Sequence, residues 1–371
     1  MKITKLELFH VKPRWLFLKM STDEGIVGWG EPIVEGRTRT VETAVHELES
    51  YLIGQDPRRI EHHWQAMNRH QFYRGGPVLV SAISGIEQAM WDIFGKSVGL
   101  PVYQLLGGPT RERIRVYAHS GGPTPAKAAE LAKARVAEGF NALKTGFPGP
   151  IKLVDTPATI ARCVEHIATL REAVGNDVDI GVDFHGIFSP AMAMRVIKEI
   201  EPYHPMFVEE PCLPENVDTL VTIARSTTIP IATGERLFTR FGFREAIEKQ
   251  AASIFQPDLS HAGGIWECRK IAAMAEMYYA GIAPHCPLGP ISLAAGLQLD
   301  ASIPNFVCQE QVSLGVGYLK QPFVVKNGHI DLPTGPGLGI EVDEDALQAH
   351  LYDGSWLNPQ TYHDDGSVAD W

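Results

Sequence analysis

Six ionisable residues follow short apolar segments in the second half of the chain, and they recur at nearly equal intervals. Asp183 ends the segment Ile-Gly-Val-Asp, Glu209 ends Met-Phe-Val-Glu, and His285 follows Gly-Ile-Ala-Pro. The intervals are 26, 26, 23, 27 and 25 residues, and the full set is Asp183, Glu209, Glu235, Asp258, His285 and Glu310. One strand, one helix and two short loops occupy about this much chain. Because all strands of a (β/α) barrel end at one mouth, the spacing predicts a shared site there.

The first three carboxylates predict a metal site. Asp183, Glu209 and Glu235 would lie at three consecutive strand ends and offer only oxygen ligands, which Mg²⁺ prefers. A single strand-end carboxylate more often caps a helix or pairs with an arginine such as Arg236. Three at near-equal spacing favour the metal. Zinc is disfavoured because no thiolate or histidine-rich cluster surrounds these positions.

Two histidines are candidates for acid/base chemistry. His185 follows the first of these carboxylates by two residues, so on an extended strand both side chains point the same way. His285 would end the seventh strand, across the mouth. Asp258, at the end of the sixth, could accept a hydrogen bond from His285, which fixes the imidazole tautomer and raises its basicity. His119 and His261 also lie near expected strand ends, and their roles stay open.

The chain from Ile114 to Glu310 alternates between strand-like and helix-like patterns, with eight strands. Helices are expected over residues 125–138, 156–174, 190–200, 217–226, 243–249 and 265–279. Such alternation is typical of a parallel sheet in an α/β fold. An open dinucleotide-binding sheet would carry Gly-x-Gly-x-x-Gly after its first strand, and the sequence has none. A TIM-like barrel is therefore predicted.

The two ends of the chain differ in pattern from this middle part. Residues 3–31 contain three strand-like segments, and helical stripes follow over 40–52 and 81–96, which predicts a small α+β domain. The tail is rich in Gly and Pro and shows no further βα unit. We predict an α+β capping domain over residues 1–112, a barrel over 113–320, and a tail over 321–371 that returns to the cap.

Composition limits the classes of partner. Of the 371 residues, 44% are hydrophobic and 21% are charged, as in a globular protein with a large core. The net charge of −11 argues against broad binding to nucleic acid or an anionic membrane. No segment approaches the roughly 18 apolar residues of a membrane helix. The five cysteines include no Cys-x-x-Cys pair, which favours reduced thiols and a cytoplasmic location.

Several motifs resemble one known family. They are Asp183-Phe-His185, Glu209-Glu-Pro, Gly234-Glu235-Arg, Gln256-Pro-Asp258-Leu-Ser-His-Ala-Gly-Gly and Ala283-Pro-His285. Together they resemble the enolase superfamily, mandelate racemase-like group. The resemblance is strongest to members that dehydrate D-galactonate. It extends over nearly the whole chain through Pro13-Arg-Trp15, Gly28-Trp-Gly-Glu-Pro, Phe72-Tyr-Arg-Gly-Gly-Pro, Ala283-Pro-His-Cys-Pro-Leu-Gly-Pro and Ser367-Val-Ala-Asp-Trp. It implies a modified (β/α)₇β barrel with an α+β cap built from both ends of the chain.

The resemblance also implies an activity and a role for each site residue. The expected reaction is Mg²⁺-dependent dehydration of an acid sugar, D-galactonate first, to its 2-dehydro-3-deoxy acid. Asp183, Glu209 and Glu235 would bind Mg²⁺, and His285 with Asp258 would remove the C2 proton. His185 would protonate the departing 3-hydroxyl, and Glu310 would stabilise the enolate. A homo-oligomer is also implied.

Alternatives to this activity stay open. The acid could be a different aldonate, such as gluconate or mannonate, or the barrel could be catalytically silent and serve only for binding. A two-metal hydrolase is disfavoured because it would need more ligands than three carboxylates.

The sequence departs from the racemases of the group at the second strand. They carry Lys-x-Lys there, whereas this chain has Lys144-Thr-Gly, which favours the two-histidine arrangement. Lys144 could touch the substrate carboxylate or the metal shell, or it could be a strand-end lysine paired with a carboxylate. Arg14, Trp15, Tyr73 and Arg74 lie in cap segments that could close over the mouth and bind substrate, or they could be packing residues. Residues 145–154 also differ from the pattern, so substrate identity is open there.

Overall fold

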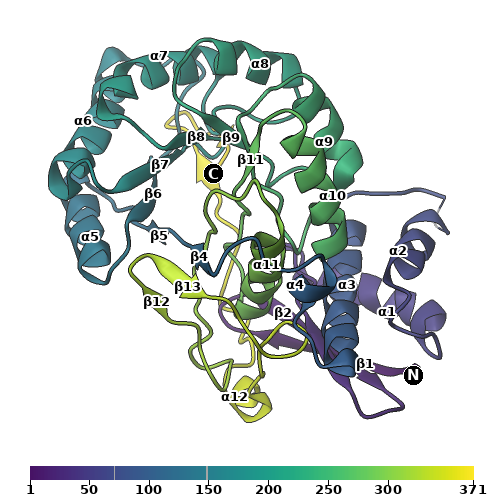
Figure 1. Ribbon diagram of the computed structural model, residues 1–371. Helices are drawn as coiled ribbons and strands as arrows, with labels where there is room; N and C mark the ends of the chain where they lie inside the picture. Colours follow the sequence, from purple (N-terminus) through teal and green to yellow (C-terminus); the bar gives the residue numbers. More distant parts are fainter. Residues whose placement is uncertain (71, 148) are drawn as a thin grey trace.

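Seven short parallel strands form the central sheet, which curves around the middle of the molecule (Figure 1). The computed structural model describes residues 1–70, 72–147 and 149–371. In sheet order the strands are β5 (Ala118–His119), β6 (Ala142–Gly146), β7 (Asp179–Asp183), β8 (Phe207–Glu209), β9 (Ile231–Thr233), β10 (Ile254–Phe255) and β11 (Gly281–Ile282). Each strand pairs in parallel with the next one along the chain. The predicted α/β class is confirmed.

A segment after β11 contacts both edges of this sheet. Phe306 forms a parallel bridge with Ile282 of β11, and Gln309 forms one with Val116, just before β5. The backbone N–H of Gln309 also donates to the carbonyl of Arg115 at 2.9 Å. Both edge strands therefore lie beside residues 306–309.

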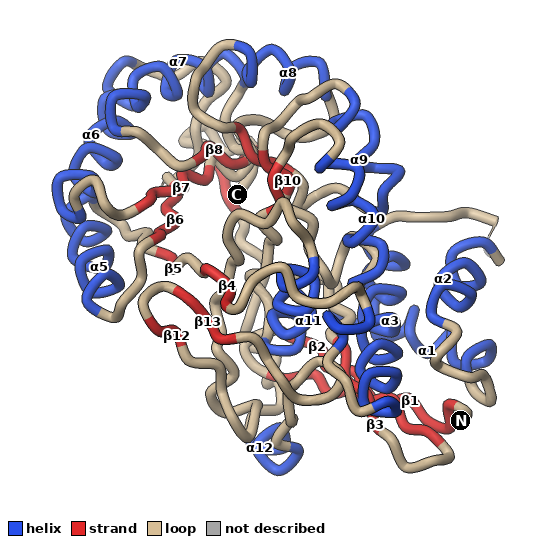
Figure 2. The backbone as a smooth tube through the Cα atoms, viewed as in Figure 1, coloured by secondary structure: helices blue, strands red, loops and turns tan. Residues whose placement is uncertain are grey.

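Helices cover the outer face of the sheet (Figure 2). They are α5 (Pro125–Ala137), α6 (Pro157–Val174), α7 (Pro190–Ile200) with a short 3₁₀ turn (Glu201–Tyr203), α8 (Val217–Arg225), α9 (Thr239–Glu248) and α10 (Ile265–Glu276). Three of them begin with a hydroxyl residue followed by proline. The hydroxyls of Thr124, Thr156 and Ser189 each accept an N–H of the first turn, while proline fixes the first helical φ.

The predicted helix ranges around the sheet are close to those observed, with three main differences. Helix α10 ends three residues before the predicted end at 279. Helix α9 begins four residues before the predicted start at 243. Helix α11 (Pro290–Ser302) was not expected from the sequence pattern. All of its residues are buried, so it lacks the alternation of polar and apolar faces that marks a surface helix.

The N-terminal part is an antiparallel meander covered by helices. Strands β1 (Ile3–Val11), β2 (Trp15–Thr22) and β3 (Val27–Gly30) form the predicted meander, followed by α1 (Thr38–Leu52), α2 (Ile60–Arg69), α3 (Pro77–Val98) and α4 (Val102–Leu105). Helix α3 crosses β3 where both elements have a glycine, Gly85 in the helix and Gly30 in the strand. A Cβ atom on Gly30 would lie 1.9 Å from the carbonyl oxygen of Gly85, so glycine is required for this approach.

The tail contacts both halves of the molecule. Strands β12 (Val325–Lys326) and β13 (His329–Asp331) form a small sheet with β4 (Arg113–Arg115). Helix α12 (Glu344–Ala349) lies near the meander, where the Glu344 carboxylate pairs with Lys19 at 2.6 Å. The chain then returns to the central sheet as a hairpin of β14 (Thr361–Tyr362) and β15 (Val368–Ala369), and in the view of Figure 1 its end overlaps the middle of the curved sheet.

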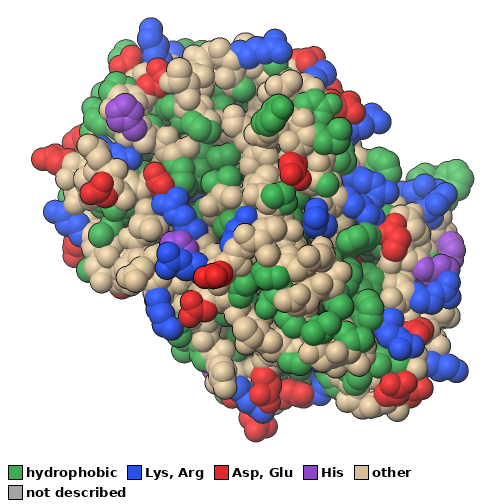
Figure 3. Space-filling view, in the orientation of Figure 1, with side chains coloured by type: hydrophobic (Ala, Val, Ile, Leu, Met, Phe, Trp, Pro, Cys, Tyr) green, Lys and Arg blue, Asp and Glu red, His purple; other side chains and the backbone are tan. Residues whose placement is uncertain are grey.

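The surface carries charges of both signs, interspersed on the face seen in Figure 3. All five cysteines are buried free thiols. Within residues 1–70, 72–147 and 149–371, none of the helices combines the length and apolar character needed to cross a membrane.

Candidate active site

The three predicted metal ligands lie at or just after the ends of three neighbouring strands. Asp183 ends β7 and Glu209 ends β8, and the two residues are paired in the sheet register. Glu235 follows β9 by two residues. The Glu209 side chain is fully buried, and 9% of the Glu235 side chain is exposed. Burial and the neighbouring charge of Asp183 raise the pKa of Glu209 well above its usual range.

Lys144 lies among these carboxylates. Its Nζ is 2.8 Å from Glu209 Oε1, 3.2 Å from Asp183 Oδ2 and 2.9 Å from Glu310 Oε1. Burial opposes its charge, but Glu209 and Glu310 raise its pKa well above the ordinary value. Lys144 is thus paired with three carboxylates, two of which belong to predicted metal ligands.

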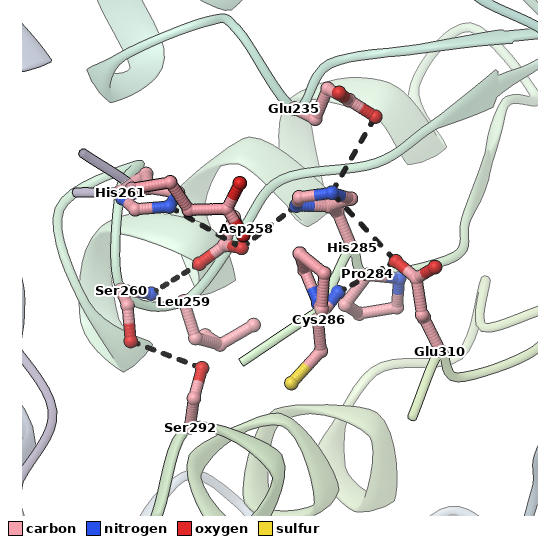
Figure 4. A network of polar contacts seen from close by, with 12 residues as sticks. Glu235, Asp258, Leu259, Ser260, His261, Pro284, His285, Cys286, Ser292 and Glu310 are labelled. Atoms are coloured by element: carbon pink, nitrogen blue, oxygen red, sulfur yellow. Dashed lines mark hydrogen bonds and ion pairs between the residues drawn. The ribbon is translucent and has the colours of Figure 1, made fainter. Parts of the chain in front are cut away.

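His285 is held by carboxylates on two sides (Figure 4). Its Nδ1 is 2.8 Å from Asp258 Oδ2, while its Nε2 is 3.6 Å from Glu235 Oε2 and 3.9 Å from Glu310 Oε2. Burial opposes charge on the ring. Glu235, Glu310 and the hydrogen bond to Asp258 nevertheless raise the pKa of His285 well above 6.5. The predicted pairing of His285 with Asp258 is present, with Nε2 directed toward the mouth.

Asp258 is itself held by the loop that follows it. Its Oδ1 accepts the backbone N–H of Ser260 at 2.7 Å, and the Ser260 hydroxyl donates to Ser292 Oγ at 3.0 Å (Figure 4). His261 Nε2 lies 3.8 Å from Asp258 Oδ2, and its Nδ1 is 2.9 Å from the Ser81 hydroxyl of α3. His261, left open by the sequence, thus links Asp258 to the N-terminal part.

His185 lies on the other side of Glu235. Its Nε2 is 3.9 Å from Glu235 Oε1, so the two carboxylate oxygens of Glu235 face the two imidazoles. His185 has a φ of +52°, which is unfavourable for a residue with a Cβ. Two backbone contacts hold it there. Its N–H donates to Asp183 Oδ1 at 2.8 Å, and its carbonyl accepts from Arg236 Nη2 at 2.8 Å.

Glu310 is buried between the two ends of the sheet. Its Oε2 accepts the backbone N–H of Cys286 at 2.8 Å, and its Oε1 pairs with His119 Nε2 at 2.8 Å. Although burial opposes ionisation, Lys144 and His285 lower its pKa well below the usual range. His119, also left open by the sequence, therefore lies in the site as a partner of Glu310.

Sequence reasoning missed Glu210 as a member of the site. It is 1% exposed, and its Oε2 pairs with Arg236 Nε at 3.0 Å. The same arginine binds the His185 carbonyl, so Glu210 and Arg236 together support the loop that carries His185. The double carboxylate Glu209-Glu210 was the available signal, but only one of the two follows the strand-end spacing.

The residues of the N-terminal part that are predicted to bind substrate, Arg14, Trp15 and Tyr73, have different surroundings in the structure. Arg14 pairs with Glu35 and stacks over Trp356 at 5.1 Å, with Nη2 3.4 Å from the Pro287 carbonyl, two residues beyond His285. Trp15 is 5% exposed and packs against the ring of Tyr318. Tyr73 is 87% exposed and lines a separate cavity beside α1 and α3.

Helix α3 presents a polar face to the loop after Asp258. This α3 polar face consists of Ser81, Ser84, Glu87 and Gln88. The Ser84 hydroxyl accepts the N–H of Gly263 at 2.9 Å, and Gln88 Nε2 donates to the Leu259 carbonyl at 2.9 Å. The Glu87 carboxylate accepts the N–H groups of Ile265 and Trp266, both at 2.8 Å, at the start of α10. Burial raises the pKa of Glu87 to about 8.

Glu31, just after β3, makes a second contact of this kind. Its carboxylate accepts the N–H of Gly289 at 2.7 Å and that of Ser292 at 2.9 Å, at the start of α11. Burial raises its pKa to about 8 as well. Carboxylates at helix N-termini satisfy free N–H groups and the helix dipole. The N-terminal part therefore fixes the loops that carry Asp258 and His285.

The donor set of the strand-end carboxylates suits a divalent cation. Within residues 1–70, 72–147 and 149–371, no three His, Cys, Asp or Glu side chains already converge closely enough to hold a metal ion. However, Glu209 Oε2 and Glu235 Oε2 are buried without a hydrogen-bond partner. Unpaired buried carboxylate oxygens are costly, and a hard cation would satisfy them.

Two family models match the chain. The model described as mandelate racemase / muconate lactonizing enzyme, N-terminal domain, matches residues 10–107. The model described as enolase C-terminal domain-like matches residues 127–346.

Individual relatives agree with these matches. D-galactonate dehydratases of Ralstonia pickettii (strain 12J) and Cronobacter sakazakii (strain ATCC BAA-894) are each 50% identical over 383 residues, covering 100% of both chains. A mandelate racemase/muconate lactonizing enzyme of Sulfitobacter sp. superposes with a TM-score of 0.93 at 36% identity, and 100% of each chain is covered. An enolase of Agrobacterium radiobacter, with bound Na and L-malate, has a TM-score of 0.93 at 31% identity and the same coverage. The chain therefore belongs to the enolase superfamily, in its mandelate racemase / muconate lactonizing enzyme group.

Proposed function

We propose that this protein is a Mg²⁺-dependent acid-sugar dehydratase that converts D-galactonate to its 2-dehydro-3-deoxy acid. The observation that carries the proposal is the pair of imidazoles on either side of Glu235, at 3.9 Å and 3.6 Å from its two oxygens. A dehydration needs a base for one carbon and an acid for the neighbouring oxygen, and these histidines lie where they can serve as that pair. Full-length relatives at 50% identity that are D-galactonate dehydratases support the substrate.

In the first step His285 removes the proton from C2. Asp258 holds Nδ1, so Nε2 is the atom that takes the proton, and the electrons of the C–H bond move into the carboxylate to give an enediolate. The enediolate carries a second negative charge. Lys144, within 3.2 Å of three carboxylates, lies where it can stabilise this charge. Glu310, whose Oε2 accepts the Cys286 N–H, lies where in its protonated form it would stabilise the enediolate by donating a hydrogen bond.

In the second step His185 protonates the 3-hydroxyl. The C3–O bond breaks as the enediolate electrons form the C2–C3 double bond, and water leaves. The resulting enol takes up a proton at C3 and becomes the 2-keto acid. Hydroxide is a poor leaving group, so a positioned acid contributes typically 10²- to 10⁴-fold.

Asp183, Glu209 and Glu235 would hold the Mg²⁺ ion. When bound, it would stabilise the charge that develops on the substrate carboxylate. The bound Na and L-malate of the Agrobacterium radiobacter relative support a site of this family that takes a cation and a hydroxy acid.

The same proposal covers organisation and partners. The contacts of residues 306–309 with both sheet edges support closure as a (β/α)₇β barrel. We propose the division into a cap (1–112), a barrel (113–320) and a returning tail (321–371). Assembly as a homo-oligomer and a cytoplasmic location stay predictions, as does the substrate role of Arg14, Trp15, Tyr73 and Lys144.

A screen of the purified protein with Mg²⁺ against a library of aldonic acids, with 2-keto acid as readout, tests the proposal. We expect turnover of D-galactonate above all other acids. Turnover of gluconate or mannonate instead would keep the chemistry and change the substrate. Absence of turnover with every acid, although Mg²⁺ binds, would contradict the proposal and favour a silent binding barrel.

A further inference from the structure

Residues of the tail form one wall of the candidate active site. Strands β14 and β15 pair through Thr361 with Ala369 and through Tyr362 with Val368. The His363 N–H donates to the Ser367 carbonyl at 2.9 Å and closes the turn. We call residues 361–369 the tail hairpin. In the view of Figure 1 the end of the chain overlaps the middle of the curved sheet, and Trp371 lines a cavity with Asp183 at the end of β7.

Trp371, which follows the tail hairpin, lies against His185. The two ring centroids are 5.7 Å apart and the rings are inclined by 48°. Trp371 is 43% exposed, so part of the indole is covered and part faces open space. His185 is the residue that we assign as the acid for the leaving hydroxyl, so Trp371 lies next to the proposed acid.

A cavity of about 420 Å³ lies beside this ring. The barrel side of the cavity is lined by Asp183, His185 and Phe147, and the tail side by Thr361 and Trp371. Cavities of roughly 300 Å³ or more are large enough for small ligands. One wall thus carries a predicted metal ligand and the predicted acid, and the facing wall carries an indole.

We propose that Trp371 is a specificity-determining residue, whose indole forms the surface on which the carbon chain of the acid sugar packs beyond C3. This inference rests on the proposed dehydratase function. A sugar acid has C–H faces as well as hydroxyls, and an indole offers both an apolar face and an N–H donor. Longer acids would gain this contact, whereas acids that end near C3 or C4 would not reach it.

The position of Trp371 also predicts which step it affects. It contacts His185, whereas His285 lies on the other side of Glu235. Loss of the indole should therefore weaken binding of the far end of the substrate. It should also lower the share of enediolate that loses water, while His285 continues to exchange the C2 proton.

The test compares Trp371→Ala with Trp371→Phe, and with Tyr362→Ala as a matched control. Tyr362 is an exposed aromatic residue of the same hairpin that lines neither this cavity nor its neighbour. Each variant is assayed with Mg²⁺ on the six-carbon acid that wild type prefers, and on a four-carbon acid with the same groups at C2 and C3. C2 proton exchange in deuterated buffer is measured in parallel.

For Trp371→Ala we expect KM for the six-carbon acid to rise roughly tenfold, which corresponds to about 1.4 kcal/mol. We expect a smaller change for the four-carbon acid and an exchange rate at saturation close to that of wild type. Trp371→Phe should recover most of the binding, and Tyr362→Ala should behave as wild type. An unchanged KM in Trp371→Ala, or an equal loss for both acids, would overturn the proposal.

Wild-type turnover, measured first, tests the proposed function alone. If wild type dehydrates an acid and Trp371→Ala matches it in both KM values, only the assignment of Trp371 fails. If wild type dehydrates none of the acids, the proposed function fails, and the assignment that rests on it falls as well.

Discussion

At the scale of single residues, Glu235 is the centre of the candidate site. Its two oxygens face His185 and His285, and we also propose it as a metal ligand. One carboxylate therefore fixes the separation of the acid and the base. The two histidines differ in their other partners. The Nδ1 of His285 is hydrogen-bonded to Asp258, which orients the ring as a base requires. The His185 ring lies 3.9 Å from Glu235 and beside the indole of Trp371, and its backbone N–H donates to Asp183.

The two histidines should fail in different ways when each is replaced. His285→Asn should abolish exchange of the C2 proton in deuterated buffer and also abolish turnover. His185→Asn should keep the exchange and lose turnover by roughly 10²-fold or more, because only departure of hydroxide needs this acid. NMR of the recovered substrate measures the exchange, and 2-keto acid formation measures turnover. His46→Asn, on the exposed surface of α1, serves as the control.

Retained C2 exchange in His285→Asn would move the base to another residue. Normal turnover in His185→Asn would remove it as the acid.

The sequence could identify the residues at strand ends but not the side chains, distant in the sequence, that they contact after folding. Asp183, Glu209, Asp258 and His285 follow from the βα spacing, because neighbouring parallel strands place equivalent positions side by side. Glu210 and His119 carry no such signal. Their relevance comes from contacts with Arg236 and Glu310, which are distant in sequence and adjacent only after folding.

At the scale of elements, helix α3 connects the two halves of the molecule. Its polar face holds the loop after Asp258, and Glu87 caps α10. The sequence predicted this helix from its apolar residues, and its buried polar residues could not be assigned partners in advance. Helix α11 could not be predicted for a different reason. All of its faces are buried, so its sequence lacks the helical periodicity of apolar residues that marks a surface helix.

Glu87 should make folding stability depend on pH. Burial raises its pKa from 4.5 to about 8, so between these values the folded state holds a proton that the unfolded state has lost. The contribution of Glu87 to stability therefore falls as the pH rises from about 4.5 to about 8. The free energy of unfolding, measured with urea, should fall between pH 5 and pH 8 in wild type. In Glu87→Gln we expect this fall to be smaller by roughly 3 to 5 kcal/mol.

Glu47→Gln, an exposed substitution on α1, is the control for this comparison and should follow the wild-type pH dependence. If the free energy of unfolding depended on pH equally in wild type and in Glu87→Gln, Glu87 would have the same pKa in the folded and unfolded states, which would contradict the prediction.

At the scale of the whole molecule, the site is assembled from three distant parts of the chain. The central sheet and its loops supply the carboxylates and histidines, the N-terminal part fixes two of these loops, and the tail supplies Trp371. The sequence predicted a tail that returns to the N-terminal part, and α12 lies there. Its continuation into the mouth had no sequence signal, because the pairing of β14 with β15 spans only a few residues.

Mg²⁺ should stabilise the whole fold through the strand-end carboxylates. A ligand that binds only the folded state adds about 2.7 kcal/mol at a hundredfold excess over its Kd. We expect Mg²⁺ to raise the Tm of wild type and to have little effect on Glu209→Gln, in which one of the three carboxylates is lost. Calorimetry with and without Mg²⁺ measures the shift. Glu248→Gln, on the exposed side of α9, should respond like wild type.

A Mg²⁺-induced rise in Tm that persists unchanged in Glu209→Gln would place the ion elsewhere.

The helix caps supplied by Glu31 and Glu87 limit how the two halves can be exchanged between relatives. A chimera that joined this barrel to a foreign N-terminal part would work only if that part presented a carboxylate to α10 and another to α11. With other residues there, buried N–H groups at the start of both helices would have no acceptor. The loops bearing Asp258 and His285 would then shift. Recombination that aims at new substrates should therefore retain these two glutamates and vary the surrounding loops.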